Sequence, residues 1–280
     1  MRDNEASGTA EFMAFFRAQE SALPVHQRLF SDPYASSFLS RHRRRLRGLF
    51  RAPFLRTLLA SYIDRRWPGA RTSAIARTRL IDDWAGEAVS LGARQIVVLG
   101  AGFDTRAWRL PCFSNLPVFE VDHPATSARK SAIVRATGMS THNVRFVAVD
   151  FEWQELDRVL AAAGFAAGKR ALVIWEGVTN YLMAEAVDGA LRWVATLAES
   201  SRLIFTYVDA GLINGSDRFG DAAAARRVVA SVGEPWTFGL EPDQPCQLPG
   251  RSRASAHQGL GGQRVPDPHY ERTRRQRAWI

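Results

Sequence analysis

The chain has 280 residues, of which 46% are hydrophobic and 23% are charged, values that are ordinary for a globular protein. Its formal net charge is +9, but the basic excess is confined to two segments. Residues 41–56 contain seven arginines and no acid, and the segment after Glu241 contains seven arginines and three acids. This uneven distribution does not mark the whole protein as a nucleic-acid binder.

The cysteine content and the lengths of the apolar runs argue against a disulfide-rich, a metal-binding or a membrane-spanning protein. The two cysteines, Cys112 and Cys246, are too few for a disulfide framework or a metal cluster, so we expect no metal site. The first residues lack the apolar core of a signal peptide, and no apolar run approaches the roughly 18 residues of a membrane helix. We therefore expect a soluble, cytoplasmic protein that has no membrane partner.

Residues 1–92 are predicted to form a helical segment in front of the main domain. Residues 35–66 are predicted as one basic helix, which Trp67-Pro68-Gly69 ends. Residues 71–91 are predicted as a further helix. The arginine run at 41–56 is either a solvated helix face or a surface that recognises an anionic substrate.

Residues 93–241 are predicted to form a Rossmann-like α/β domain. Five short apolar runs alternate with segments of helical spacing, which is the pattern of a parallel sheet with helices on both faces. The predicted strands are 95–99, 117–122, 144–150, 171–175 and 203–208, and the predicted helices between them include 124–137, 152–163 and 184–199. Residues 242–280 are rich in Pro, Gly, Arg and Ser and are predicted to be an irregular or disordered tail.

Ligands of open parallel sheets bind at the carboxyl ends of the strands, and glycines or acids follow four of the predicted strands. Gly100 and Gly102 match the first two positions of a dinucleotide fingerprint, but Thr105 replaces its third glycine. Asp122 comes 22 residues after Gly100, a spacing at which an acid accepts hydrogen bonds from ribose hydroxyls. The alternatives are a strand-to-helix turn without a ligand and a solvated acid at a strand end.

The third and fourth strand ends carry residues that suit a cofactor and a substrate. Asp150 would accept a hydrogen bond from an adenine amino group and Phe151 would pack on the purine ring, although Asp is also a common helix cap. Glu176 and Tyr181 lie in the segment 175–182, where a transferred group would meet a substrate. The alternative is that this segment only caps the next helix.

Six segments together carry a resemblance to one known family. The strongest are VLGAGFDTRAWRL at 98–110, FEVDHP at 119–124 and WEGVTNYL at 175–182. The others are SDPYA at 31–35, ARTRLID at 76–82 and GEPWTFG at 233–239. In order and spacing they resemble the leucine carboxyl methyltransferase family, in particular its bacterial branch of S-adenosylmethionine-dependent methyltransferases.

The resemblance implies a class I methyltransferase fold with an N-terminal helical cover and S-adenosylmethionine as the cofactor. It also implies seven residues that hold this cofactor: Arg77 at the methionine carboxylate, Gly100 and Gly102 at the methionine end, Asp122 at the ribose, Asp150 and Phe151 at the adenine, and Glu176 near the amino group. The methyl acceptor is expected to be a carboxylate or a hydroxyl of a small molecule or a protein. Glu176 and Tyr181 are the expected catalytic residues.

The C-terminal segment departs from the family, and other functions stay open. Family members continue after GEPWTFG with a helix and an antiparallel hairpin, which residues 245–280 do not resemble. The alternatives are therefore a decayed, non-catalytic protein, or an RNA-binding module that uses the arginine run. A further alternative is a nicotinamide-dependent oxidoreductase, against which the missing third glycine and the acids Asp150 and Glu176 argue.

Overall fold

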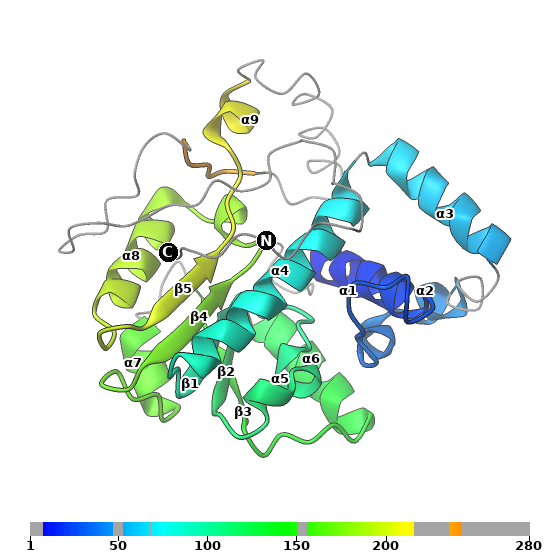
Figure 1. Ribbon diagram of the computed structural model, residues 1–280. Helices are drawn as coiled ribbons and strands as arrows, with labels where there is room; N and C mark the ends of the chain where they lie inside the picture. Colours follow the sequence, from blue (N-terminus) through cyan, green and yellow to red (C-terminus); the bar gives the residue numbers. More distant parts are fainter. Residues whose placement is uncertain (1–7, 47–52, 68, 151–155, 216–235, 242–280) are drawn as a thin grey trace.

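A five-stranded parallel sheet forms the centre of the protein (Figure 1). The computed structural model describes residues 8–46, 53–67, 69–150, 156–215 and 236–241. The strands are β1 (Gln95–Leu99), β2 (Val118–Asp122), β3 (Val144–Ala148), β4 (Ala171–Trp175) and β5 (Arg202–Phe205), in the order β3-β2-β1-β4-β5. Each neighbouring pair is parallel, so the predicted Rossmann-like α/β fold is confirmed.

Three helices cover one face of the sheet: α4 (Ala70–Ser90), α5 (Arg106–Arg109) and α6 (Pro124–Ala136). Ile81, Ala85 and Ala88 recur at helical spacing along α4 and pack against Ile96 and Leu172 of the sheet. The helix that the sequence placed in the N-terminal segment is therefore part of the core of the main domain.

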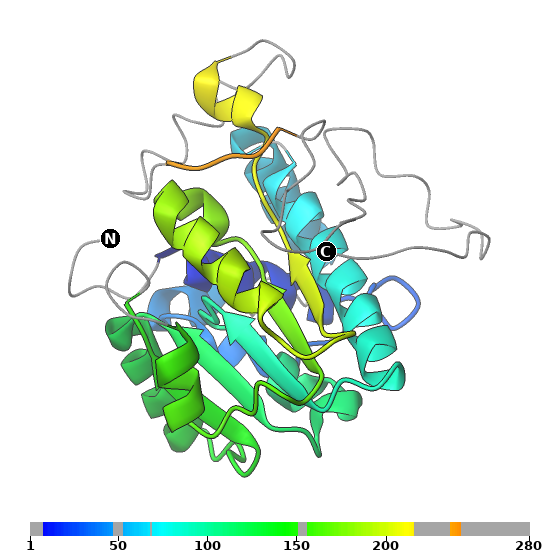
Figure 2. The same ribbon diagram turned by 90° about the vertical axis from the view of Figure 1, so that its left-hand side faces the viewer.

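Two helices cover the opposite face: α7 (Leu156–Ala162) and α8 (Ala184–Ala195), as the turned view shows (Figure 2). Val97 and Val173 point to this face and belong to one buried cluster with Leu160 and Leu191 of the helices. Because side chains alternate along a strand, a central strand must be apolar on both sides to sit between two helical layers. This explains why β1 and β4, which are buried throughout, are almost continuous apolar runs, whereas the edge strand β3 exposes Arg145 and Ala148.

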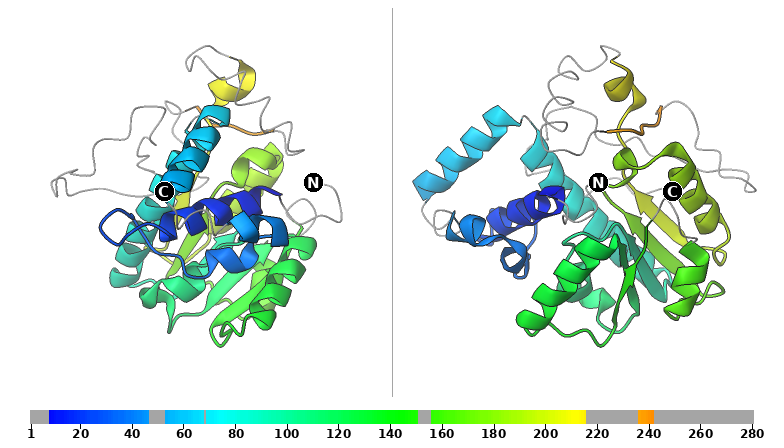
Figure 3. Two further views of the ribbon diagram at one scale, coloured as in Figure 1. Left: turned by 90° about the vertical axis from the view of Figure 1, so that its right-hand side faces the viewer. Right: turned by 180° about the vertical axis from the view of Figure 1, so that it is seen from behind.

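The N-terminal segment forms a further layer beside the sheet (Figure 3). It contains α1 (Gly8–Ser21), a 3-10 helix (Ala35–Phe38), α2 (Arg41–Leu46) and α3 (Pro53–Arg66). Phe16 of α1 and Phe38 are buried in one cluster with Phe103, which follows β1. The rings of Phe38 and Phe103 stack with their centroids 5.2 Å apart. The predicted helical cover thus contacts the loop that follows the first strand.

The predicted single helix over 35–66 is wrong. Leu39 has an extended backbone (φ −81°, ψ 141°) and separates the 3-10 helix from α2. Helix α3 begins at Pro53, a residue that suits the first turn of a helix because it has no N–H to leave unpaired. The predicted end is close to the observed one, since α3 stops at Arg66 and Gly69, with a φ of 76°, precedes α4.

Two strands end earlier than predicted. Ala148, the last residue of β3, pairs with Asp122, which is the last residue of β2. Beyond this pair β2 offers no further partner, so Asp150 lies in a loop and not in the strand. The last residue of β5, Phe205, pairs with Trp175 at the end of β4 for the same reason.

After β5 the described chain contains α9 (Ala210–Asn214) and residues 236–241. Leu240 accepts a backbone hydrogen bond from Ala210 and donates one to Val208, which fixes residues 236–241 beside α9. The predicted tail, residues 242–280, lies outside the described residues. None of the helices in the described ranges is long and apolar enough to cross a membrane.

Candidate cofactor-binding site

The carboxyl edge of the sheet brings together the four strand ends that the sequence singled out. Gly100 follows β1, Asp122 ends β2, Asp150 comes two residues after β3, and Glu176 follows β4. All four lie along one edge because the strands are parallel. The strand order reverses between β1 and β4, and the crevice at such a switch point is where open α/β sheets bind ligands.

The loop after β1 contains two glycines at positions where a residue with a side chain would fit poorly. Gly100 and Gly102 have φ values of 62° and 44°, in the left-handed region that favours glycine. A Cβ atom on Gly100 would lie 2.2 Å from a methyl carbon of Val178, and one on Gly102 would lie 3.2 Å from the Cβ of Ala10. The close approach of Val178 and Ala10 explains why these two positions of the fingerprint are glycine.

Thr105 stands where a dinucleotide fingerprint has its third glycine. Its hydroxyl donates a 2.6 Å hydrogen bond to Asp32, and Arg17 Nε donates one of 2.9 Å to the same carboxylate oxygen. The other oxygen of Asp32 accepts a 2.9 Å hydrogen bond from the N–H of Ala35. This buried carboxylate ties the N-terminal layer to the loop after β1, which gives the aspartate of the SDPYA segment a structural role.

Asp122 closes this loop from the neighbouring strand. Its Oδ2 accepts a hydrogen bond from the N–H of Gly102, and its Oδ1 accepts one of 2.7 Å from the N–H of His123. Burial raises the pKa of Asp122, and these two backbone hydrogen bonds oppose the rise. A carboxylate oxygen can accept more than one hydrogen bond, so Asp122 can still accept two hydroxyl groups such as those of a ribose.

Asp150 lies in the loop two residues after β3, the strand that neighbours β2. The N–H of Val149 donates a 2.9 Å hydrogen bond to the carbonyl of Asp122, so the chain reaches Asp150 from the same edge. Phe151, the predicted adenine partner, lies outside the described residues. The adenine-binding roles of both residues stay predictions.

Glu176 is held between two arginines. Arg77 Nε donates a 2.7 Å hydrogen bond to Oε1, and Arg106 Nη2 lies 2.9 Å from Oε2. Arg77 comes from α4 and Glu176 from the end of β4, so the fold joins residues that are 99 positions apart. Arg77 and Glu176 present a cation and an anion side by side, which matches the carboxylate and the ammonium group of an amino acid.

The two arginines also determine the charge of Glu176. Burial alone raises the pKa of this carboxyl group, but Arg106 and Arg77 outweigh burial and lower the pKa from 4.5 to about 2. A carboxyl group whose pKa is lower in the folded state stabilises the fold above its unfolded pKa, and that contribution is lost as the pH falls through the folded pKa. Glu176 is therefore an anion throughout the neutral range.

We expect Glu176→Gln to flatten the acid dependence of stability. In the parent the contribution of Glu176 is complete above pH 4.5 and is lost as the pH falls toward 2, whereas glutamine does not titrate. The measurement is the free energy of unfolding in denaturant for both proteins at several pH values in this window. If the difference between them is the same at each pH, the assigned charge of Glu176 is incorrect.

Arg106 is the site residue that sequence reasoning missed. It is 2% exposed, and its guanidinium contacts three carboxylates: Asp82 of α4 at 2.8 Å, Asp104 of the loop after β1, and Glu176. Arg109 pairs with Asp82 as well, with Nη2 2.7 Å from Oδ1. The sequence signal is the DTR triplet within a motif, but local spacing does not show that three separate segments deliver acids to this arginine.

Tyr181 ends a 3-10 helix (Thr179–Tyr181) that begins three residues after Glu176. The N–H of Gly177 donates a 2.7 Å hydrogen bond to the hydroxyl of Thr206, and the hydroxyl of Thr179 donates one of 2.8 Å to the carbonyl of Thr206. These bonds anchor the segment after β4 to the end of β5. The predicted catalytic role of Tyr181 stays a prediction.

Residues 236–241 also reach this edge of the sheet. Thr237 N–H donates a 2.7 Å hydrogen bond to the carbonyl of Asn180, and the Thr237 hydroxyl donates one of 2.9 Å to the carbonyl of Leu182. The described part of the GEPWTFG segment thus supports the segment after β4, a placement that the sequence did not predict.

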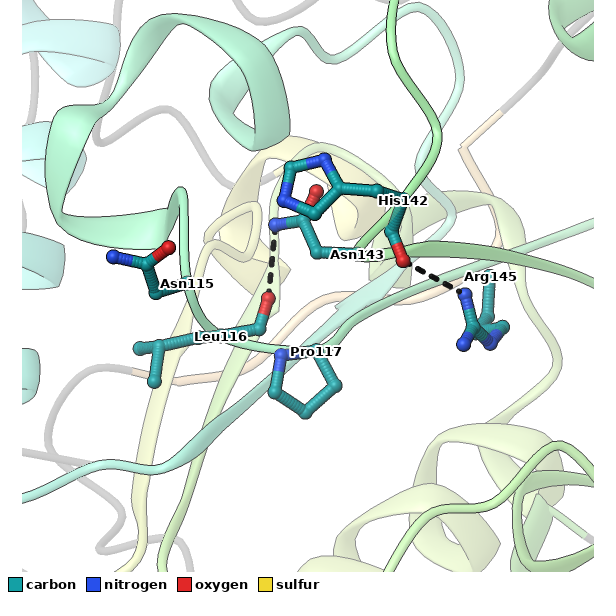
Figure 4. A pocket seen from close by; sticks show the side chains of 6 residues that line it. All are labelled: Asn115, Leu116, Pro117, His142, Asn143 and Arg145. Atoms are coloured by element: carbon teal, nitrogen blue, oxygen red, sulfur yellow. Dashed lines mark hydrogen bonds between the residues drawn. The ribbon is translucent and has the colours of Figure 1, made fainter.

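A small pocket lies at the opposite edge of the sheet, before β2 and β3 (Figure 4). It has a volume of about 330 Å³ and is lined by Asn115, Leu116, Pro117, His142, Asn143 and Arg145. The amide nitrogen of Asn143 donates to the carbonyls of Phe113 and Leu116 at 2.8 and 2.9 Å, so this polar group already has protein partners. None of the predicted site residues lines this pocket. Across the described residues no group of three or more His, Cys, Asp and Glu is placed to hold a metal ion.

The fold and the carboxyl edge are those of an open α/β protein that binds an extended cofactor at a switch point of its sheet. Comparisons with known proteins narrow this class. The sequence profile described as "Leucine carboxyl methyltransferase" matches residues 10–195. A "putative S-adenosyl-L-methionine-dependent methyltransferase" of Frankia alni is 35% identical over 81% of this chain and 76% of that relative. A relative with the same description from Streptomyces coelicolor is 34% identical over 89% of this chain and 83% of its own length.

The solved structures agree at the level of the fold. The crystal structure of a "putative methyltransferase" from Thermobifida fusca matches 82% of this chain and 78% of its own, with a TM-score of 0.50 and 17% identity. The chain belongs to the leucine carboxyl methyltransferase family. The resemblance seen in the sequence motifs is thereby confirmed.

Proposed function

We propose that this protein transfers a methyl group from S-adenosylmethionine to a carboxylate of its acceptor. As a member of its family, the chain is an S-adenosylmethionine-dependent methyltransferase, so the nicotinamide-dependent oxidoreductase is no longer an alternative. The observation that carries the choice of a carboxylate is the pair of arginines that holds Glu176.

The residues at the carboxyl edge fit this cofactor. Two loop glycines let the backbone turn beside the methionine end, and Arg77 and Glu176 are complementary to the methionine carboxylate and ammonium. The remaining proposed contacts are Asp122 with the ribose hydroxyls, and Asp150 and Phe151 with the adenine. When bound, the cofactor supplies an electrophilic methyl group on a positively charged sulfur.

The need for a base distinguishes a hydroxyl acceptor from a carboxylate acceptor. A hydroxyl group needs a base to remove its proton, whereas a carboxylate is already an anion at neutral pH. Glu176 has a pKa of about 2 and both of its oxygens face arginines, so it is a weak base. His123 Nδ1 accepts a 3.3 Å hydrogen bond from the N–H of Ala125 and caps α6, which engages that nitrogen.

With a carboxylate acceptor, the main task of the enzyme is to align the carboxylate with the methyl group of the cofactor. Methyl transfer is an in-line displacement, and holding nucleophile and methyl group in line supplies much of the rate. Glu176 and Tyr181, the residues predicted to be catalytic, then act by orienting the reactants and not as bases.

The chemical stability of the transferred methyl group tests this proposal. Purified protein is incubated with S-adenosylmethionine that carries a labelled methyl group, together with fractionated carboxylic acids and peptides. We expect label that mild alkali releases as methanol, because alkali hydrolyses a methyl ester and leaves a methyl ether intact. Alkali-stable label would contradict a carboxylate acceptor. Cofactor binding without transfer to any fraction would favour the decayed enzyme.

A further inference from the structure

Helix α3 presents an apolar face to solvent. Phe54, Leu58 and Tyr62 follow one another at intervals of four residues and are 76%, 57% and 62% exposed. Leu55, which is 38% exposed, lies beside them on the same side of the helix. We call these four residues the outward face of α3. Single exposed apolar residues are common on protein surfaces. Four of them on one side of a helix indicate a surface that a membrane or a partner molecule covers.

The packing of α3 keeps this face turned outward. Ile63 lies on the other side of the helix and is 4% exposed in the cluster that α1 and the 3-10 helix share. Figures 1 and 3 show α3 at the periphery of the molecule, away from the central sheet. The outward face of α3 is therefore exposed to solvent at the periphery of the protein.

The chain around this face is strongly basic. Residues 41–66 contain nine arginines and a single acid, Asp64, whose carboxylate is paired with Arg71 at 2.5 Å. Arg65 and Arg66 are exposed at the end of α3, and Arg41 and Arg44 are exposed on α2. The apolar face is thus bordered by cations at both ends.

This charge decides which occupant fits. The segment 242–280 has seven arginines against three acids, and a second copy of the chain would bring the same basic surface, so both are repelled. Nucleic acid supplies phosphates but no apolar medium for Leu55 and Leu58. An anionic bilayer supplies both, because basic amphipathic helices place apolar side chains below the headgroups and arginines among the phosphates.

We propose that the outward face of α3 and its flanking arginines dock the protein on anionic lipid surfaces. The protein would lie on the membrane and would not span it, which agrees with the lack of a spanning helix in the described ranges. The expectation of no membrane partner was based on missing spanning segments and does not address this mode of contact. The proposal does not depend on the identity of the methyl acceptor.

Vesicle sedimentation tests this proposal with the full chain. The parent is mixed with vesicles of phosphatidylcholine alone and with vesicles that also contain phosphatidylglycerol. We expect sedimentation with the anionic vesicles only, and release at high salt because salt screens the arginines. The double variant Leu58→Gln/Tyr62→Gln keeps the charge and should bind the anionic vesicles at least roughly tenfold more weakly, because two apolar side chains no longer enter the lipid.

A matched control separates this face from exposed apolar residues in general. Val25 and Leu91 are 77% and 50% exposed outside α3, so Val25→Gln/Leu91→Gln should bind vesicles like the parent. Circular dichroism and cofactor affinity should be unchanged in both double variants, which shows that they fold.

Parent protein that stays in solution, equal binding to both vesicle types, or equal binding by the α3 variant would overturn the proposal. A dimer that the α3 variant splits would assign the face to a second copy, and salt-sensitive RNA binding without lipid binding would assign the arginines to RNA.

Discussion

Asp122→Ala is expected to weaken binding of S-adenosylmethionine by about 1.5–3 kcal/mol, because hydrogen bonds from the ribose to a charged acceptor are lost. This corresponds to a rise in Kd of roughly ten- to a hundredfold. Both oxygens of Asp122 are already fixed by backbone N–H groups, those of Gly102 and His123. It is therefore oriented before any cofactor binds, and its loss should not be compensated by a neighbour.

Calorimetric titration with the cofactor measures this effect. Two further variants test whether the loss of affinity is specific to the carboxylate of Asp122. Asp122→Asn keeps one carbonyl oxygen as an acceptor for Gly102 but removes the charge, so its affinity should lie between those of the parent and the alanine variant. Asp188→Ala removes an acid of α8 that pairs with Arg192 on the helix surface and should leave the affinity unchanged. Equal affinities of the parent and Asp122→Ala would remove Asp122 from the cofactor site.

Arg106→Met is expected to cause the largest loss of stability. The guanidinium lies against Asp82, Asp104 and Glu176, and its side chain is 3% exposed. Methionine is similar in length but leaves these carboxylates without their shared cation. Arg109 still pairs with Asp82 and Arg77 with Glu176, so Asp104 is the acid that loses its salt bridge. Removing one partner of a buried ion pair costs about 3–5 kcal/mol, since the remaining charge stays buried without its counter-charge.

Denaturant unfolding measures this loss against an exposed pair on α4. Arg79 pairs with Asp83 four residues on, with side chains that are 51% and 55% exposed, so Arg79→Met should cost less than about 1 kcal/mol. Arg106→Lys keeps the charge but lacks the planar fork, and it should be intermediate and still fold if the methionine variant does not. A loss for Arg106→Met no greater than that for Arg79→Met would show that the buried acids do not depend on Arg106.

The strand ends were predictable because their signals are local. A parallel strand buried on both faces must be an apolar run, and the residue directly after it must lie at the carboxyl edge. Gly100, Asp122, Asp150 and Glu176 each lie at the end of such a run, so their common edge could be inferred before any contact was known. The early ends of β3 and β5 were not predictable, because strand length depends on the partner strand.

The helical layer was harder to predict, since helix boundaries there depend on packing. The helical pattern over 35–66 is nearly continuous in the sequence, but Leu39 is buried at 3% exposure and extended between two helices. The exposed apolar face of α3 was equally hidden, because an apolar stripe in a sequence does not show whether a neighbour covers it.

The amino-acid sequence alone was sufficient for the family, the order of the strands along the chain and the residues at the carboxyl edge, because these are encoded in short apolar runs and in the residues at their ends. Only the folded chain revealed the buried ionic cluster, in which Arg106 meets acids from α4, the loop after β1 and the end of β4. Ion pairs between distant segments depend on distances in three dimensions, and a single sequence does not contain those distances.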